Sequence, residues 1–225
     1  MNKYKVIILS LLISFMGASC EDWLYDNVNE DAAHEVLPQQ VLPVVLFYSA
    51  QLQFDHAEYG AYLTQTLTTG GRNQTSSFAY KSGWGDFLTM NRHPQWRRHF
   101  YDIGVNAKEI IDEAHEAQAW NLELIGRTLR LMSTQMTTDL FGDMPRSEAY
   151  ESNSPHYDTQ ESIYEWMNQE IEELIGMYED PTYTEAATNI PIDQSIDRVF
   201  AGDLNKWKHN TYCLLYTSPS PRDTR

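Results

Sequence analysis

The segment from Arg72 to Trp84 combines side chains that are suited to binding sugars. Arg72, Asn73 and Gln74 offer hydrogen-bonding groups, whereas Tyr80 and Trp84 offer flat aromatic faces. A sugar exposes C–H faces that stack on aromatic rings, and its hydroxyl groups need polar partners. These residues are therefore predicted to form a carbohydrate-contacting loop. The alternative is that the rings fill the scaffold and the polar residues only form turns.

Catalytic chemistry has weaker support. Asp139 and Asp143 could act as the acid and nucleophile of a glycosidase, but a chain with 32 acidic residues contains such pairs by chance. His115-Glu116 lacks the second histidine of a zinc-binding helix, and neither a nucleophile elbow nor a glycine-rich phosphate loop occurs. The prediction is a protein that is not an enzyme and uses no cofactor or metal. A lipid-anchored glycoside hydrolase or peptidase is the alternative.

The N-terminus has the parts of an export signal. Residues 1–5 are short and basic, residues 6–16 are apolar, and Gly17-Ala18-Ser19 precedes Cys20. The apolar run of about a dozen residues is too short to cross a bilayer, which needs about 20 residues as a helix. Small residues before a cysteine resemble the lipobox of bacterial lipoproteins. We expect residues 1–19 to be a signal peptide, Cys20 to be diacylated and residues 20–39 to form a tether. An ordinary signal peptide with unmodified Cys20 is the alternative.

The composition indicates a folded, acidic protein. The 225 residues carry a formal charge of −16, and 42% of them are apolar and 12% aromatic. The acidic excess would repel a phosphate backbone, so nucleic acid is excluded as a partner. A disordered chain would have far fewer aromatic residues.

Helical periodicity dominates the rest of the chain, and no segment alternates with period two for long enough to form a sheet. The spacing predicts a helix over residues 40–66, a helical hairpin over 96–114 and 122–140, and a helix after Asp158, which is predicted to cap it. Glycine, asparagine and proline over residues 70–95 predict a long loop. Four tryptophans on periodic faces are expected in the core: Trp96, Trp120, Trp166 and Trp207. The predicted fold class is all-α.

Several stretches together resemble the SusD/RagB family of nutrient-binding outer-membrane lipoproteins, most closely its SusD-like branch. The first is Cys20-Glu21-Asp22-Trp23-Leu24, whose acidic pair also resembles a surface-export signal of Bacteroidetes lipoproteins. The others are residues 96–111, residues 139–149 with 155–164, and residues 202–208. The most distinctive is the run Phe141-Gly142-Asp143-Met144-Pro145, a helix stop in which glycine accepts positive φ and proline prevents resumption.

The resemblance implies tetratricopeptide-like helix pairs with long functional loops, here over residues 40–211. It also implies a surface-exposed protein, lipid-anchored in the outer membrane, that binds an oligosaccharide or in some cases a peptide. Its partner would be a SusC-type TonB-dependent transporter, to which it delivers the nutrient. A helical-repeat adaptor that binds only another protein is a further alternative. Residues 212–225 resemble translated sequencing adapter, so we expect them to be non-native and the chain to be the N-terminal portion of a longer, truncated protein.

Overall fold

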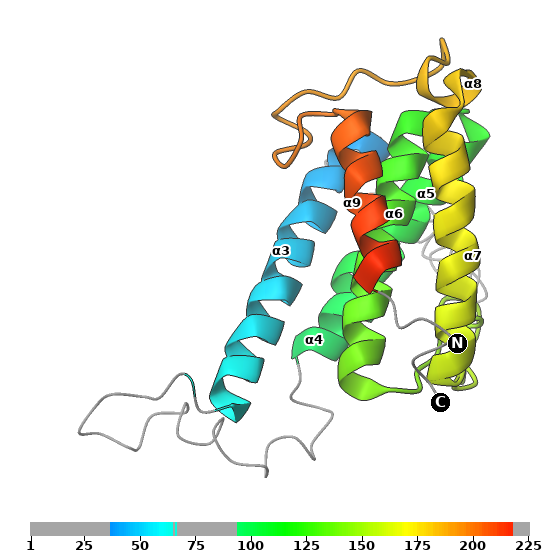
Figure 1. The fold of residues 1–225 in the computed structure, drawn as a ribbon. Coiled ribbons are helices and arrows are strands. Elements are labelled where there is room, and N and C mark those ends of the chain that lie inside the picture. Colours follow the sequence, from blue (N-terminus) through cyan, green and yellow to red (C-terminus); the bar gives the residue numbers. More distant parts are fainter. Residues whose placement is uncertain (1–36, 65, 67–93, 218–225) are drawn as a thin grey trace, which may run out of the picture. The chain divides into compact units, whose positions relative to one another are not determined.

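The part of the chain that the structure describes is built from helices (Figure 1). The computed structural model describes residues 37–64, 66 and 94–217. Its helices are α3 (Pro38–Leu63), α4 (Pro94–Arg97), α5 (Asn106–Glu116), α6 (Trp120–Phe141), α7 (Gln160–Glu179), α8 (Pro181–Thr184) and α9 (Leu204–Thr217), and the π-helical segment η3 (Arg98–Val105) joins α4 to α5. Within these ranges no strand forms, apart from an isolated bridge between Met144 and Asp158. The all-α prediction is confirmed.

Helix α6 is the central element of the described residues. It contacts α3, η3 and α5 on one side and α7, α8 and α9 on the other. The sequence predicts a single apolar stripe that includes Leu122 and Ile125, but Leu124 and Leu131 are fully buried as well. A helix that neighbours enclose on several sides needs no solvent-facing side. The predicted pairing of residues 96–114 with 122–140 is present as the packed hairpin of α5 and α6.

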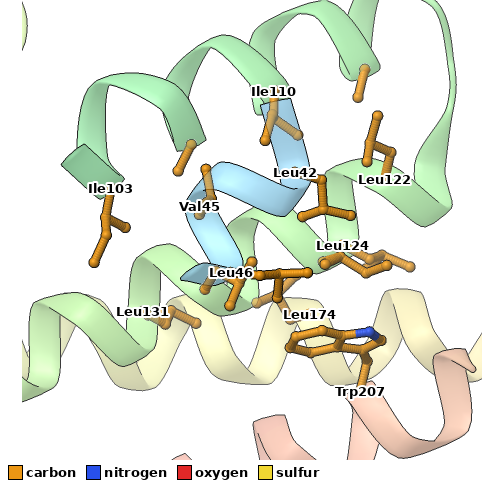
Figure 2. Close-up of a cluster of buried hydrophobic side chains, with 14 of the residues drawn as sticks. Leu42, Val45, Leu46, Ile103, Ile110, Leu122, Leu124, Leu131, Leu174 and Trp207 are labelled. Carbon is orange, nitrogen blue, oxygen red and sulfur yellow. The ribbon is translucent and has the colours of Figure 1, made fainter. Parts of the chain in front are cut away.

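The hydrophobic core lies where α3, η3, α5, α6, α7 and α9 meet, as Figure 2 shows. It includes Leu42, Val45 and Leu46 of α3, Ile103 of η3, Ile110 of α5, Leu122, Leu124 and Leu131 of α6, Leu174 of α7 and Trp207 of α9. Of the tryptophans predicted in the core, only Trp207 is fully buried, at 1% exposure. Trp96, Trp120 and Trp166 are partly buried and pack against its edge.

A charge network around the buried Arg127 fixes α7 against α6. Arg127 Nε donates to Glu170 at 2.7 Å, and its Nη2 donates to Glu173 at 2.9 Å. Burial acts to lower the pKa of Arg127, but the hydrogen bonds and charges of Glu170 and Glu173 outweigh it, so the pKa is raised overall. Arg127 therefore stays charged, and these contacts set how α7 lies along α6.

The start of α7 differs from the prediction by one residue. Thr159, not Asp158, is the N-cap, and its hydroxyl oxygen accepts a hydrogen bond from the backbone N–H of Ser162. The carboxylate of Asp158 is already engaged by Arg146 and Ser147 in the preceding loop. Both residues are good caps, so only the tertiary partners decide which one serves.

Helix α9 runs across the predicted boundary at residue 211. It continues to Thr217, and Leu214 packs in the core. The non-native origin of residues 212–225 stays a prediction.

Candidate ligand-binding site

The residues predicted to contact sugar, Arg72, Asn73, Gln74, Tyr80 and Trp84, lie outside the described residues. The predicted lipidation site, Cys20, also lies outside them. Their roles stay predictions. The described residues contain two adjoining cavities, and neither includes a residue predicted to contact sugar.

The larger cavity, here called the aromatic groove, has a volume of about 750 Å³. Its aromatic residues are Trp96, Phe100, Tyr101, Tyr150 and Tyr157. One wall comes from α4, η3 and α5, and the other from the loop over residues 142–159 between α6 and α7. Ligand pockets commonly have volumes of about 300–1,000 Å³, so the groove is large enough for a small oligosaccharide.

The rings of Trp96 and Tyr157 form the best-defined surface in the aromatic groove. Their centroids are 6.3 Å apart and their planes differ by only 20°. Trp96 is held from behind by Phe100 at 4.7 Å and by Phe141 at 5.2 Å. Tyr157 and, on the opposite wall, Tyr101 are 58% and 69% exposed. These faces are open to a ligand, and flat apolar ligand faces stack favourably on such rings.

The loop over residues 142–159 is held by hydrogen bonds at both ends. Gly142 ends α6 with φ +76°, as the predicted helix stop requires. The backbones of Met144 and Asp158 then exchange two hydrogen bonds, at 3.2 and 3.1 Å. Farther along, the Glu148 carboxylate lies 3.1 Å from the His156 imidazole, which raises the pKa of His156 and lowers that of Glu148. Tyr157 is thus carried on a well-tied loop.

The opposite wall depends on the π-helical segment η3. A Cβ atom at Gly104 would overlap the hydroxyl group of Tyr150, so glycine lets the loop approach the helix closely here. Single π-turns inserted between α-helical segments are often found at functional sites. The apolar spacing of residues 96–114 indicates only a regular helix, and for this reason the sequence did not reveal the π-turn.

The smaller cavity, here called the arginine pocket, has a volume of about 230 Å³. It adjoins the aromatic groove, because Lys108, Tyr150 and Glu151 line both. Inside it, the Cζ atoms of Arg130 and Arg146 lie 5.8 and 4.7 Å from the ring centroid of Trp166. These distances are typical of cation–π contacts.

His99 forms part of the floor of the arginine pocket. Its Nδ1 lies 2.7 Å from the hydroxyl oxygen of Ser133, and the side chain is buried. Burial lowers the pKa of His99 to about 3, so the imidazole is neutral near pH 7. It can exchange a hydrogen bond but adds no charge to the pocket.

The carboxylates considered for a hydrolase have structural partners. Asp139 accepts a hydrogen bond from the Tyr164 hydroxyl, and Asp143 Oδ1 accepts one from the backbone N–H of Gln160 at 2.8 Å. Both acids lie outside the two cavities, and Glu151 is the only carboxylate among the residues lining the aromatic groove. Most glycosidases need two carboxylates across the scissile bond. Of the residues lining the two cavities, Asp112 and Glu151 are the carboxylates.

The sequence carries a signal for this site in the loop before α7. Residues 150–157 carry two tyrosines among serine, asparagine and proline, the same mixture of aromatic and turn residues that drew attention to residues 72–84. The tyrosines follow a helix stop, and a segment of that kind is typical of a loop positioned by a rigid scaffold. The signal does not reveal that Trp96 and Tyr101 lie across from them.

Comparisons with known proteins identify the family. No helix among the described residues is long and apolar enough to cross a membrane, and within them no group of three or more metal-binding side chains forms. A search of curated proteins finds no match. The model of a SusD-like family, described as starch-binding and associating with the outer membrane, matches residues 48–215. This match covers most of the 225 residues, including α6, η3 and the loop that forms both cavities, and the chain therefore belongs to the SusD-like family.

Proposed function

We propose that this protein is a surface lipoprotein that binds a nutrient glycan and delivers it to a SusC-type TonB-dependent transporter. The family is described as starch-binding and associated with the outer membrane. In this chain, the aromatic groove is the observation that supports the proposal, because its exposed rings suit the apolar faces of sugars. The predicted loop residues Arg72, Asn73, Gln74, Tyr80 and Trp84 are proposed to contribute further contacts to the ligand.

The side chains that line the groove suit a protein that binds a glycan without cleaving it. Ser152, Asn153 and Ser154 follow Glu151 along one wall and offer partners for sugar hydroxyl groups. Glu151 is the single carboxylate lining the aromatic groove, whereas an inverting glycosidase uses one carboxyl group to protonate the leaving oxygen and a second to activate water. Affinity would come from stacking and hydrogen bonds, and the helices would keep the walls apart.

The proposal is tested by titrating the purified full chain with maltoheptaose in a calorimeter. Replacement of Tyr157 by Ala should weaken binding about fivefold, because it removes one stacking face worth about 1 kcal/mol. Phe54, which is 60% exposed on α3 and lies outside both cavities, provides the matched control. Phe54→Ala should bind like the parent. The proposal fails if the parent binds no oligosaccharide on a broad glycan array, or if it releases reducing sugar.

Membrane attachment through Cys20 is a separate part of the proposal. Two acyl chains would bury enough methylene groups for stable anchoring without a spanning helix. The parent should fractionate with outer membranes and show a diacylated Cys20 in mass spectra, whereas Cys20→Ala should be released from membranes. Co-purification of a β-barrel transporter with the parent would support delivery. An unmodified mature N-terminus at another residue would contradict the anchor.

A further inference from the structure

The arginine pocket holds two guanidinium groups with unused hydrogen-bond donors. The Nε atoms of Arg130 and Arg146 are buried, and neither has a hydrogen-bond partner among the described residues. Buried polar groups in folded proteins nearly always have partners. Both arginines line the same cavity, so their guanidinium groups would meet an acceptor that enters it.

The charges of both arginines are also poorly compensated. Arg130 Nη2 lies 3.6 Å from Glu170 Oε1, but that oxygen already accepts a 2.7 Å hydrogen bond from Arg127. Within the described part of the chain, the Arg146 side chain makes no ion pair within 4.0 Å. Its guanidinium lies over Trp166, and its charge interacts with the carboxylate of Asp158 at longer range. The pocket thus presents positive charge that no carboxylate fully neutralises.

The arginine pocket is also lined by Lys108, Asp112, His99 and Glu151. Lys108 pairs with Asp112. His99 is neutral, as described above. Glu151 lines the pocket but makes no ion pair with either arginine among the described residues. Glu151 would oppose an incoming anion, as would Asp112 and Glu170, whose charges also act on Arg130.

Tyr150 adds a neutral donor beside the arginines. Burial raises the pKa of its hydroxyl to about 12, although the charge of Arg130 acts in the opposite direction. The hydroxyl therefore keeps its proton at neutral pH. An oxyanion in the pocket would meet two guanidinium groups and can also meet this hydroxyl, a set of donors that suits carboxylate or sulfate oxygens.

We propose that the arginine pocket binds the anionic substituent, a carboxylate or a sulfate ester, of an acidic glycan whose sugar rings lie in the aromatic groove. This inference rests on the proposed function, because it assigns the substrate class of the same site. The shared wall of Lys108, Tyr150 and Glu151 makes the two cavities neighbours, so one oligosaccharide can occupy both. The volume of about 230 Å³ suits a charged group rather than a whole oligosaccharide.

The test compares ligands that differ only in charge. The purified full chain is titrated with tetragalacturonate and with its fully methyl-esterified form, and then with a sulfated chondroitin tetrasaccharide and its desulfated form. Maltoheptaose and sodium sulfate are titrated separately. At least one acidic form should bind about tenfold more tightly than its neutral counterpart, because guanidinium groups pair strongly with oxyanions. The pair that shows this difference distinguishes carboxylate from sulfate.

Substitutions test whether the arginine pocket causes the preference for the acidic form. Arg146→Gln should abolish the preference for the acidic form, Arg146→Lys should restore part of it, and Glu151→Gln should increase it, since a competing negative charge is lost. Arg198→Gln, at an exposed arginine outside both cavities, should keep the parent ratio. Melting temperatures confirm that each variant folds.

The outcomes separate this inference from the proposed function. If the parent binds maltoheptaose but does not distinguish acidic from neutral forms, the acidic substrate class is wrong and glycan binding stands. The same conclusion follows if Arg146→Gln lowers the melting temperature and leaves the preference intact, because Arg146 is then only structural. If sodium sulfate binds in an Arg146-dependent way but no sugar binds, the anion site stands and the glycan function fails. Both fail if nothing binds.

Discussion

The carboxylate of Asp158 holds Ser147 through both its backbone and its side chain: Oδ2 accepts from the Ser147 N–H at 2.9 Å, and Oδ1 accepts from the Ser147 hydroxyl at 2.9 Å. Oδ2 also accepts from the backbone N–H of Arg146 at 2.8 Å. This one side chain therefore sets the course of the loop that carries Arg146 into the arginine pocket and Tyr157 into the aromatic groove.

Asp158→Ala should open this loop. The N–H groups of Arg146 and Ser147 would lose their acceptor, at a cost of about 1–2 kcal/mol, since water replaces part of the interaction at a half-buried site. Urea unfolding should show the loss of stability, and calorimetry should show weaker glycan binding. Asp158→Asn keeps one acceptor oxygen and should lie between the parent and the Ala variant. A variant with unchanged stability and binding would show that the loop is held by other contacts.

Replacement of Gly104 by Ala should destabilise the protein although alanine favours helices. The new Cβ would overlap the Tyr150 hydroxyl and approach the His99 carbonyl, which should cost about 1–3 kcal/mol as overpacking. Gly176 in α7 provides the matched control, because a Cβ there meets nothing within 4 Å. Gly176→Ala should stabilise by about 0.5–1 kcal/mol. Equal thermal shifts in the two variants would contradict the close approach at Gly104.

Asp197→Ala should be strongly destabilising. The fully buried Asp197 accepts hydrogen bonds from the backbone N–H groups of Val199, Phe200 and Gly202 and from the indole Nε1 of Trp207, at 2.8–3.1 Å. Without the carboxylate all four donors lose their acceptor and the indole N–H of Trp207 stays buried and unpaired, at a cost of about 3 kcal/mol or more. Thermal unfolding and Trp fluorescence measure the effect.

Asp193 is the control for this prediction. It lies in the same connecting segment and accepts from the Ser195 N–H at 2.7 Å, but it is exposed, so water can take over its interactions. Asp193→Ala should change stability far less than Asp197→Ala. Similar losses in the two variants would rule out a special role for the buried carboxylate.

His99 should make stability fall in mild acid. Burial lowers its pKa to about 3 from an ordinary value of 6.5. The imidazole binds a proton near pH 6.5 in the unfolded chain but not in the folded protein. The contribution of His99 to the free energy of unfolding is therefore fully present above pH 6.5. Below that pH it decreases by about 1.4 kcal/mol per pH unit, until the folded state is also protonated near pH 3.

Urea unfolding at several pH values between 7 and 4 checks this. In His99→Gln, the free energy of unfolding should depend less steeply on pH, and its slope should be smaller than that of the parent by close to one proton. Ser133→Ala removes the hydrogen-bond partner but keeps the imidazole buried, so the slope should persist in that variant. If His99→Gln has the slope of the parent, His99 is not the group responsible.

Helix positions could be predicted because the signal is local. Apolar residues three and four apart mark a buried side whatever that side packs against, and this located α3, α6 and α7 within a few residues. The single helix predicted over residues 96–114 is divided into α4, η3 and α5. The same signal does not show how many sides of α6 are covered. Leu124 and Leu131 are buried because α3, α7 and α9 close around the helix.

The two cavities could not be predicted, because their walls are far apart in the chain. Trp96 and Tyr157 are separated by the whole α5–α6 hairpin, and each looks ordinary in its own segment. The choice of Thr159 over Asp158 as helix cap likewise depends on a tertiary contact, because the Asp158 carboxylate accepts a hydrogen bond from the Ser147 N–H.

The amino-acid order by itself determined the all-α class, the helix stop at Gly142, the acidic character and the family resemblance, because each of these rests on composition, spacing or short motifs. Only the tertiary structure decided which aromatic rings share a groove and which arginines lack partners. Those properties depend on distances between residues that the chain brings together only when α6 packs against its neighbours.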